Sequence, residues 1–445
     1  MTLVKFCHQT EKIFTIVLIL ILTEGILRKW MIDSPAVSNI FMVARDPFLL
    51  WIVVKGFQYR VIKNVHLKGL MIISIITFIT TFISGHQNII VAIFGARLAF
   101  IYFPAIFVFG KTLSYEYVCK CGRFFLYIFP FMVALIIAQF FSPASSFINA
   151  KLNGVGRDLD GASYEYQFKA MGIFMSITGL VSYFMMSISF LILYYVHPPQ
   201  LKQQIKSVTF FICLLALVAS YPFAVSRTYI FFSCTAFLLY LRVLDKKNIK
   251  RLFSVGIVLG IVLLILSTND SFDIAVSTMT ARYEGATNSE GKGAGTLYVI
   301  YYRSIGWVFD LMETYGNEIP FFGYGDGSIT NVGAQLLSIT KTDILHKVGD
   351  NEWASILAEK GFFFGLIYLI LRIIMGIEIL KKALKLRRYG YIEPILFAPF
   401  PVISLFFMPM RAPQVVGLIF VACTFEWVMI YNAQRQISLR KRMHP

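Results

Sequence analysis

The chain has 445 residues, of which 57% are hydrophobic and 15% are charged, and its mean hydropathy is +0.70. These values exclude a soluble globular domain and indicate a polytopic membrane protein. A net charge of +17 would suggest a nucleic-acid partner in a soluble chain. Here the basic residues cluster in short links between apolar runs, as they do in cytoplasmic loops, so we expect a lipid bilayer and no nucleic acid as a partner.

Apolar runs predict an all-α integral membrane protein. A helix needs about 20 apolar residues to span a bilayer, and about twelve runs qualify, at 13–28, 37–55, 68–85, 88–110, 124–142, 170–196, 207–223, 227–244, 252–268, 352–376, 393–410 and 414–432. The first run contains Glu24 and has no small-residue cleavage site, so we expect a retained anchor. This pattern predicts a membrane domain with helices 1 to 9 over 1–268, a large loop over 269–351, and helices 10 to 12 with a basic tail over 352–445.

The distribution of lysine and arginine predicts the orientation of these helices. Basic residues occupy alternate links and the tail, which places those segments and both termini in the cytoplasm; they include Lys55, Lys63, Lys111, Lys202, Lys247, Lys385 and Arg440. The large loop carries ten acidic residues from Asp270 to Asp350 and five basic ones. We therefore expect the loop on the extracytoplasmic side.

Several charged residues lie inside apolar runs, where each needs a partner or a function. Glu24 and Arg28 share one helix face, and Arg45 with Asp46 lies in the second run. We expect a structural ion cluster there, and the alternative is a route for a polar ligand. Arg97 has no acid nearby in the sequence, so contact with an anion and a buried structural pairing are equally open.

Three further arginines fall at the predicted outer surface, where positive charge is otherwise scarce. They are Arg227, Arg303 and Arg411. Guanidinium groups bind phosphate oxygens bidentately, so this arrangement suggests a phosphorylated ligand. The alternative for Arg227 is snorkelling at the interface.

Two other features of the loop are weaker signals. The glycine run from Gly323 to Gly327 lacks the Lys-Ser/Thr of a P-loop and follows no strand. His346 is a candidate catalytic residue, although a solvated loop histidine is the commoner case. The histidines are scattered, and no His, Asp or Glu spacing resembles a ligand set, so we expect no metal and no other cofactor.

The order and sidedness of these motifs resemble those of the O-antigen polymerase and O-antigen ligase superfamily. The resemblance covers about residues 221–365 and rests on Ser226-Arg227, Arg303-x-x-x-Trp307, Gly323-x-Gly325, an asparagine-containing motif, and Glu359-x-Gly361-x-x-x-Gly365. It implies an inverting, metal-independent glycosyltransferase with a GT-C-like fold. The implied donor is an undecaprenyl-pyrophosphate-linked oligosaccharide at the periplasmic face of a bacterial inner membrane.

The resemblance also implies roles for particular residues. Ligases typically place a histidine before the asparagine of the late motif, whereas Asp350 stands here, which favours a Wzy-type polymerase. Arginine donors over the departing phosphate would stabilise its charge without a metal; the candidates are Arg227, Arg303, Arg411 and Arg97. Asp350 is the first candidate for the general base, followed by Glu352 and His346.

Other functions stay open at this point. An O-antigen ligase would transfer the glycan to a different acceptor, and a lipid-linked oligosaccharide flippase or exporter would line a translocation route with the buried arginines. A flippase usually shows repeated halves, and no internal repeat is visible in the sequence. A membrane assembly protein without chemistry is a third possibility. If the chain is a polymerase, a chain-length regulator is a further expected partner.

Overall fold

The computed structural model describes residues 3–32, 34–143, 145–150, 152–153, 156–157, 170–196, 205–289, 298, 301, 306–316, 318–339, 345, 348 and 351–443. These residues are mostly helical. The described strands, β1 (Leu152–Asn153) and β2 (Gly156–Arg157), form a short antiparallel pair in which Leu152 opposes Arg157. The fold is consistent with the all-α membrane protein that the sequence predicts.

Eight helices or helix pairs in the described part of the chain are long and apolar enough to cross a membrane. They are Val37–Gln58, Val65–Ile83, Ile89–Thr112, Tyr115–Phe141, Ile177–Val196, Ser207–Ala224, Phe362–Arg387 and Pro413–Met443. A ninth span results if α12 (Lys246–Leu266) and α13 (Asp270–Ser289) count as one, although the chain bends by 107° between them. The finer prediction of twelve spans is therefore not confirmed.

Two of the four remaining predicted spans form a shorter helix or a broken one. The run at 227–244 becomes α11 (Arg227–Val243), with 17 residues, and the run at 393–410 divides into α20 (Glu393–Phe397) and α21 (Pro399–Phe407). The prediction of one helix over 352–376 is wrong. Helix α18 (Glu352–Lys360) ends at Gly361, whose φ of +73° interrupts the helix before α19 (Phe362–Arg387) begins.

The N-terminal half supplies the other elements of the bundle. Helix α1 (Leu3–Ile26) continues into a π-helical turn, and α5 is likewise joined to α6 through a π-helical turn. Asparagine or serine side chains cap α4, α5 and α7. The elements are η1 (Leu27–Met31), α2 (Pro35–Val43), α3 (Asp46–Gln58), α4 (Val65–Ile83), α5 (Ile89–Arg97), η2 (Leu98–Tyr102), α6 (Phe103–Thr112), α7 (Tyr115–Phe141), η3 (Phe147–Asn149), α8 (Ile177–Val196) and α10 (Ser207–Ala224).

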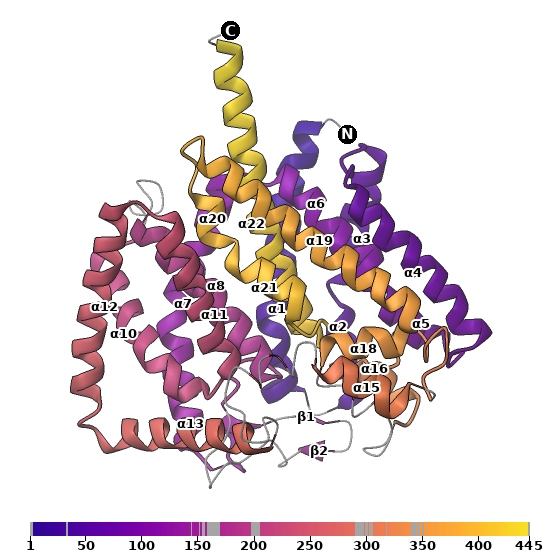
Figure 1. Cartoon of the computed structure of the whole chain (residues 1–445), viewed down its shortest axis with the longest axis horizontal. Helices are drawn as coiled ribbons and strands as arrows, with labels where there is room; N and C mark the ends of the chain where they lie inside the picture. Colours follow the sequence, from indigo (N-terminus) through magenta and orange to yellow (C-terminus); the bar gives the residue numbers. More distant parts are fainter. Residues whose placement is uncertain are drawn as a thin grey trace.

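Helix α22 (Pro413–Met443) forms the centre of the molecule. Its apolar stretch is buried almost completely, and it packs against α1, α6, α8 and α19. A helix that is hydrophobic on all sides needs such a surrounding layer. Figure 1 shows α22 running through the bundle and extending beyond it at the C-terminal end.

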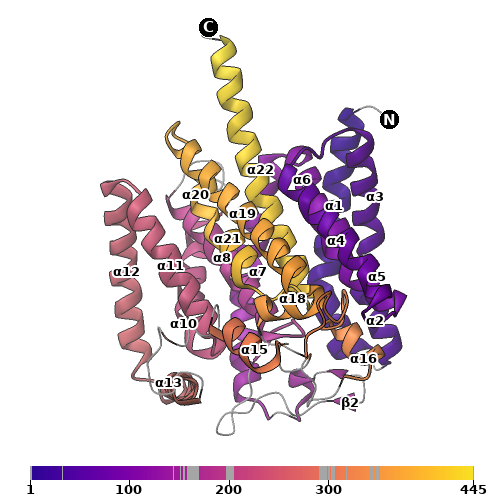
Figure 2. The same ribbon diagram turned by 45° about the vertical axis from the view of Figure 1, so that its right-hand side comes forward.

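The two ends of the bundle carry different segments. Both termini lie at one end, and the described parts of 269–351 lie at the other, as both views show (Figures 1 and 2). This segment is more structured than a plain loop, because it contains α13, α15 (Trp307–Tyr315) and α16 (Asn331–Leu336). Helix α13 lies across the ends of its neighbours.

Candidate functional site

A cavity of about 50 Å³ lies where α5 and η2 meet α18, α19 and the start of α22. Figure 1 shows α5 and α18 toward the end of the bundle that carries the described parts of 269–351. The cavity has room for a few water-sized groups. The side chains that line it include Arg97, Glu352, Glu359, Lys360, Arg372 and Arg411. Four cationic groups and two carboxyl groups thus surround the cavity. Three of the seven predicted site residues, Arg97, Glu352 and Arg411, come together here.

Arg97 is the last residue of α5 and is buried. Its Nη1 donates to Asp46 Oδ2 at 3.2 Å and to the carbonyl of Met42 at 3.4 Å. Its guanidinium carbon lies 3.6 Å from the centre of the Phe94 ring. The partner that the local sequence lacks therefore comes from α3, and the same side chain also reaches the cavity.

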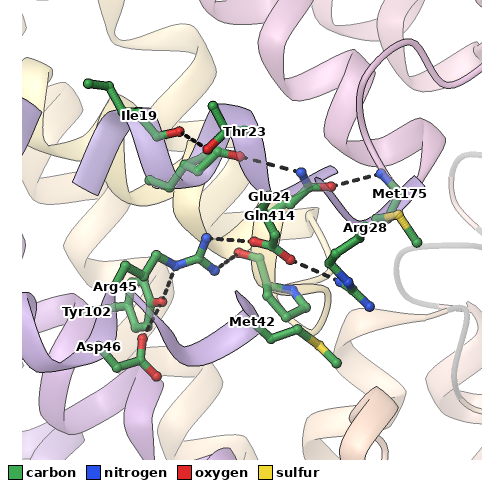
Figure 3. Close-up of polar contacts among 12 residues, drawn as sticks. Ile19, Thr23, Glu24, Arg28, Met42, Arg45, Asp46, Tyr102, Met175 and Gln414 are labelled. Carbon is green, nitrogen blue, oxygen red and sulfur yellow. Dashed lines mark hydrogen bonds and ion pairs between the residues drawn. The ribbon is translucent and has the colours of Figure 1, made fainter. Parts of the chain in front are cut away.

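Arg97 belongs to a buried ion network that joins α1, α3 and η2. Figure 3 shows Glu24 between two guanidinium groups, with Arg28 Nη1 and Arg45 Nη1 each 3.0 Å from one of its oxygens. Arg45 Nε donates to the Tyr102 hydroxyl at 2.6 Å, and Tyr102 donates to Asp46 Oδ1 at 2.8 Å. Arg45 also donates to the carbonyl of Pro413. The network ties the N-terminal helices to α22, in agreement with a structural cluster.

Glu352, a predicted catalytic residue, is held by several partners. Its Oε1 accepts from Arg372 Nη1, and its Oε2 accepts from the backbone N–H of Met410 at 3.1 Å. Arg411 Nε lies 3.7 Å from the same Oε2. The carboxylate thus fixes the start of α18 to α19 and to the corner before α22. Both oxygens of this carboxylate are thus engaged within the fold.

Arg372 lies in the apolar run Leu-Ile-Leu-Arg-Ile-Ile of α19 and was not among the residues that the sequence predicts for the site. It is fully buried, and Nη2 donates to the carbonyls of Ser404 at 3.1 Å and Met408 at 3.0 Å. Its Nε has no hydrogen-bond partner among the described residues, and the same holds for the hydroxyl of Ser74. Both residues line the cavity, and buried polar atoms without a partner call for an explanation.

Arg411 holds the first turn of α18 from the other side. Its Nη2 donates to the carbonyl of Asn351 at 2.7 Å and to the Ser355 hydroxyl. The Asn351 side chain caps the helix by accepting from the N–H of Ala354 at 3.0 Å. Arg411 is half-buried, and its guanidinium group lines the cavity.

The glycine run serves packing. Gly323, Gly325 and Gly327 all have positive φ, and a Cβ at Gly327 would lie 2.2 Å from the carbonyl oxygen of Val91. A Cβ at Gly323 would lie 2.4 Å from the carbonyl oxygen of Glu359, and at this close approach Tyr324 N and Gly325 N donate to the carbonyls of Ala358 and Glu359 at 2.8 and 2.9 Å. These bonds satisfy the last carbonyls of α18. The two backbone donors are therefore engaged within the fold.

The glycine run also contains Asp326, which forms a buried ion pair with Lys360. Asp326 Oδ1 lies 2.6 Å from Lys360 Nζ, and its Oδ2 accepts from the Thr77 hydroxyl at 2.9 Å. Burial acts to lower the pKa of Lys360, but the neighbouring Asp326 carboxylate outweighs it, so the pKa lies above its ordinary value. Lys360 is therefore a fixed positive charge at the wall of the cavity.

Glu359 is the second carboxyl group in the lining. Its Oε1 accepts from the N–H of Ile329 at 2.9 Å, and its Oε2 makes no hydrogen bond to any described residue. Burial raises the pKa of Glu359 to about 7, with the positive charge of Lys360 acting in the opposite direction.

The structure describes only one of the four other predicted site residues. Arg303, His346 and Asp350 fall outside the described residues. Arg227 begins α11, is half-buried, and is not among the residues that line the cavity. Among the described residues, no group of three or more His, Cys, Asp or Glu side chains is placed to hold a metal ion.

No protein-family model matches this chain, and no curated protein matches it either. The resemblance to the O-antigen polymerase and ligase superfamily accordingly rests on the motifs and their order.

Proposed function

We propose that this protein is a polysaccharide polymerase of the membrane, a metal-independent inverting glycosyltransferase. It transfers a growing glycan from undecaprenyl pyrophosphate to a lipid-linked repeat unit, at the periplasmic face of a bacterial inner membrane. The observation that carries the proposal is the cavity in which Arg97, Lys360, Arg372 and Arg411 surround a small polar space. The helices α5 and α18, which supply part of its lining, lie toward the end of the bundle opposite the two termini (Figure 1).

The charge of this cavity suits the departing group. Glycosyl transfer from a lipid pyrophosphate leaves negative charge on phosphate oxygens as the bond to the anomeric carbon breaks. Fixed cations in a partly dehydrated site stabilise that charge strongly, because they need no reorganisation at the moment of reaction. Arg372 Nε and the Ser74 hydroxyl, which have no hydrogen-bond partner among the described residues, belong to two of the lining residues and are further potential donors.

The surrounding architecture suits a polyprenyl substrate. Large apolar side chains are exposed on the outer faces of α3, α4 and α5, where lipid would cover them. The prenyl tail can therefore remain in the bilayer while its charged head group reaches the end of α5. Burial of the apolar tail in the bilayer would add to the binding free energy that the charged head group gains in the cavity.

The decisive experiment gives purified protein in liposomes one substrate, a lipid-linked repeat unit, and resolves the products on a gel. We expect a ladder of increasing length that forms equally well in the presence of EDTA. The Lys120→Ala variant, altered at an exposed ion pair far from the cavity, is the control and should give the same ladder. Movement of unchanged substrate across the bilayer would indicate a flippase. Product that forms only when a non-prenyl acceptor is added would indicate a ligase.

A further inference from the structure

The two carboxyl groups of the cavity differ in how many of their oxygen atoms already accept hydrogen bonds. Glu352 is bound by Arg372 and by the N–H of Met410, with Arg411 close by. Glu359 uses one oxygen for the N–H of Ile329, and its other oxygen makes no hydrogen bond to a described residue. Both lie in α18 and both line the cavity. Glu359 therefore lines the candidate site and retains one oxygen without a hydrogen bond to the described residues.

The charged surroundings of Glu359 allow it to exchange a proton. Burial disfavours its ionised form, whereas Lys360 and Arg411 favour it and Asp326 opposes it. A carboxyl group that ionises near neutral pH is a better general base at that pH than an ordinary one. The other titratable or charged groups around the same cavity are Arg97, Glu352, Tyr368 and Arg372.

From this geometry we infer that Glu359 is the proton acceptor of the transfer reaction, an assignment that rests on the proposed function. The acceptor hydroxyl oxygen forms a bond to the anomeric carbon. The bond from that carbon to the phosphate oxygen breaks, and its electron pair leaves with the pyrophosphate. The hydroxyl proton passes to Glu359 Oε2. No oxidant or metal takes part, and the atoms balance within these partners.

The simpler reading of Glu359 is that it only holds the loop through its bond to Ile329. Glu359→Gln separates the two, because the amide oxygen can still accept from the N–H of Ile329 while the group can no longer accept a proton. Glu318 is exposed and lies outside the cavity, so Glu318→Gln is the matched control. Glu359→Asp keeps the carboxyl group but shortens its reach.

The test measures initial rates of polymer formation in liposomes, with kcat and KM separated, at several values between about pH 5.5 and 9. For the natural chain and Glu318→Gln we expect kcat to rise about tenfold per pH unit below about 7 and to level off above it, because the base must be deprotonated. Glu359→Gln should lower kcat by about 10²-fold or more, change KM little, and abolish this pH dependence.

Each other result has a defined meaning. A Glu359→Gln protein with near-normal kcat and an unchanged pH profile would overturn the assignment and direct the search to Asp350 and His346. If Glu359→Gln does not fold, Glu359→Asp decides: a displaced pH profile supports the assignment, and an unchanged one rejects it. Absence of product from the natural chain at every pH would reject the proposed function itself, and the assignment with it.

Discussion

Two neighbouring clusters of buried charge differ in how completely their groups are paired. In the ion network of Figure 3, every carboxylate oxygen of Glu24 and Asp46 lies within 3.2 Å of a guanidinium or phenol group. In the cavity, Arg372 Nε has no partner among the described residues, and Glu359 Oε2 makes no hydrogen bond to them. The first cluster is complete without a ligand, and the second is not.

This difference separates a structural role from a chemical one. Buried charges that satisfy one another fix the positions of the helices they join. Buried polar groups that lack partners cost free energy, so each of them needs an explanation. Arg97 belongs to both clusters, since it donates to Asp46 and lines the cavity. The network thus positions one of the cations that the cavity presents.

The largest expected effect is on the stability of the network. Arg45→Ala leaves Glu24 and the Tyr102 hydroxyl short of a buried partner, so we expect the free energy of unfolding to fall by about 3–5 kcal/mol. The measurement is reversible unfolding in mixed micelles by SDS titration. Polymer formation per folded molecule should change little. A loss below about 1 kcal/mol would show that the network is not the structural cluster described here.

The next effect concerns rate rather than stability. Arg411→Ala removes a cation from the cavity, and we expect polymer formation to slow by about 10²–10³-fold. Arg227 does not line the cavity, so Arg227→Ala should slow the reaction by less than about 10-fold. Initial rates in liposomes, normalised to folded protein, give both numbers. Equal losses in the two variants would mean that the reacting groups extend beyond the cavity.

A smaller effect tests the glycine run that supports the cavity. Gly327→Ala forces a side chain into a backbone with φ of +85° and against Val91, so we expect a loss of about 1–3 kcal/mol together with slower transfer. Gly256 in α12 has no atom near an added Cβ, and Gly256→Ala should stabilise the helix by about 0.5–1 kcal/mol. Thermal unfolding of both variants checks the pair. Equal stability in the two would exclude the packing role.

The smallest effect comes from a charge pair outside both clusters. Lys120 and Glu116 lie 3.0 Å apart on α7, and both are largely exposed. We expect Lys120→Ala to change the free energy of unfolding by less than about 1 kcal/mol, because water screens such pairs. SDS titration beside Arg45→Ala gives the contrast directly. If Lys120→Ala lowered the free energy of unfolding as much as Arg45→Ala, burial could not explain why the network stabilises the protein more strongly.

Hydropathy predicted a helix correctly where an apolar run folds as a single uninterrupted helix. The runs at 207–223 and 414–432, for example, correspond to α10 and α22. It failed where backbone conformation interrupts a run, as at Gly361 and before Pro399. Hydropathy averages over a window and does not register a single residue with positive φ or a proline that ends a helix.

The site was predicted less completely than the helices. Arg97, Glu352 and Arg411 were named from the sequence and do meet at the cavity, whereas Arg372 and Lys360 were missed. The partners of these charges come from distant segments, such as Asp46 for Arg97 and Asp326 for Lys360. Sequence spacing shows which residues share a helix face but not which helix that face meets. A single arginine within an apolar run was the available signal for Arg372.

The length of α18 has a consequence of its own. Glu352 is the first of its nine residues, and Glu359 follows seven residues later. Seven residues make nearly two turns, so the two carboxyl groups leave the same face about 10 Å apart along the axis. Arg411 clamps one end of the helix, and the glycine run clamps the other. The length of the helix therefore sets the spacing of the two carboxyl groups. One residue inserted between them would rotate Glu359 by about 100° about the helix axis, although the amino acids that line the cavity would be the same.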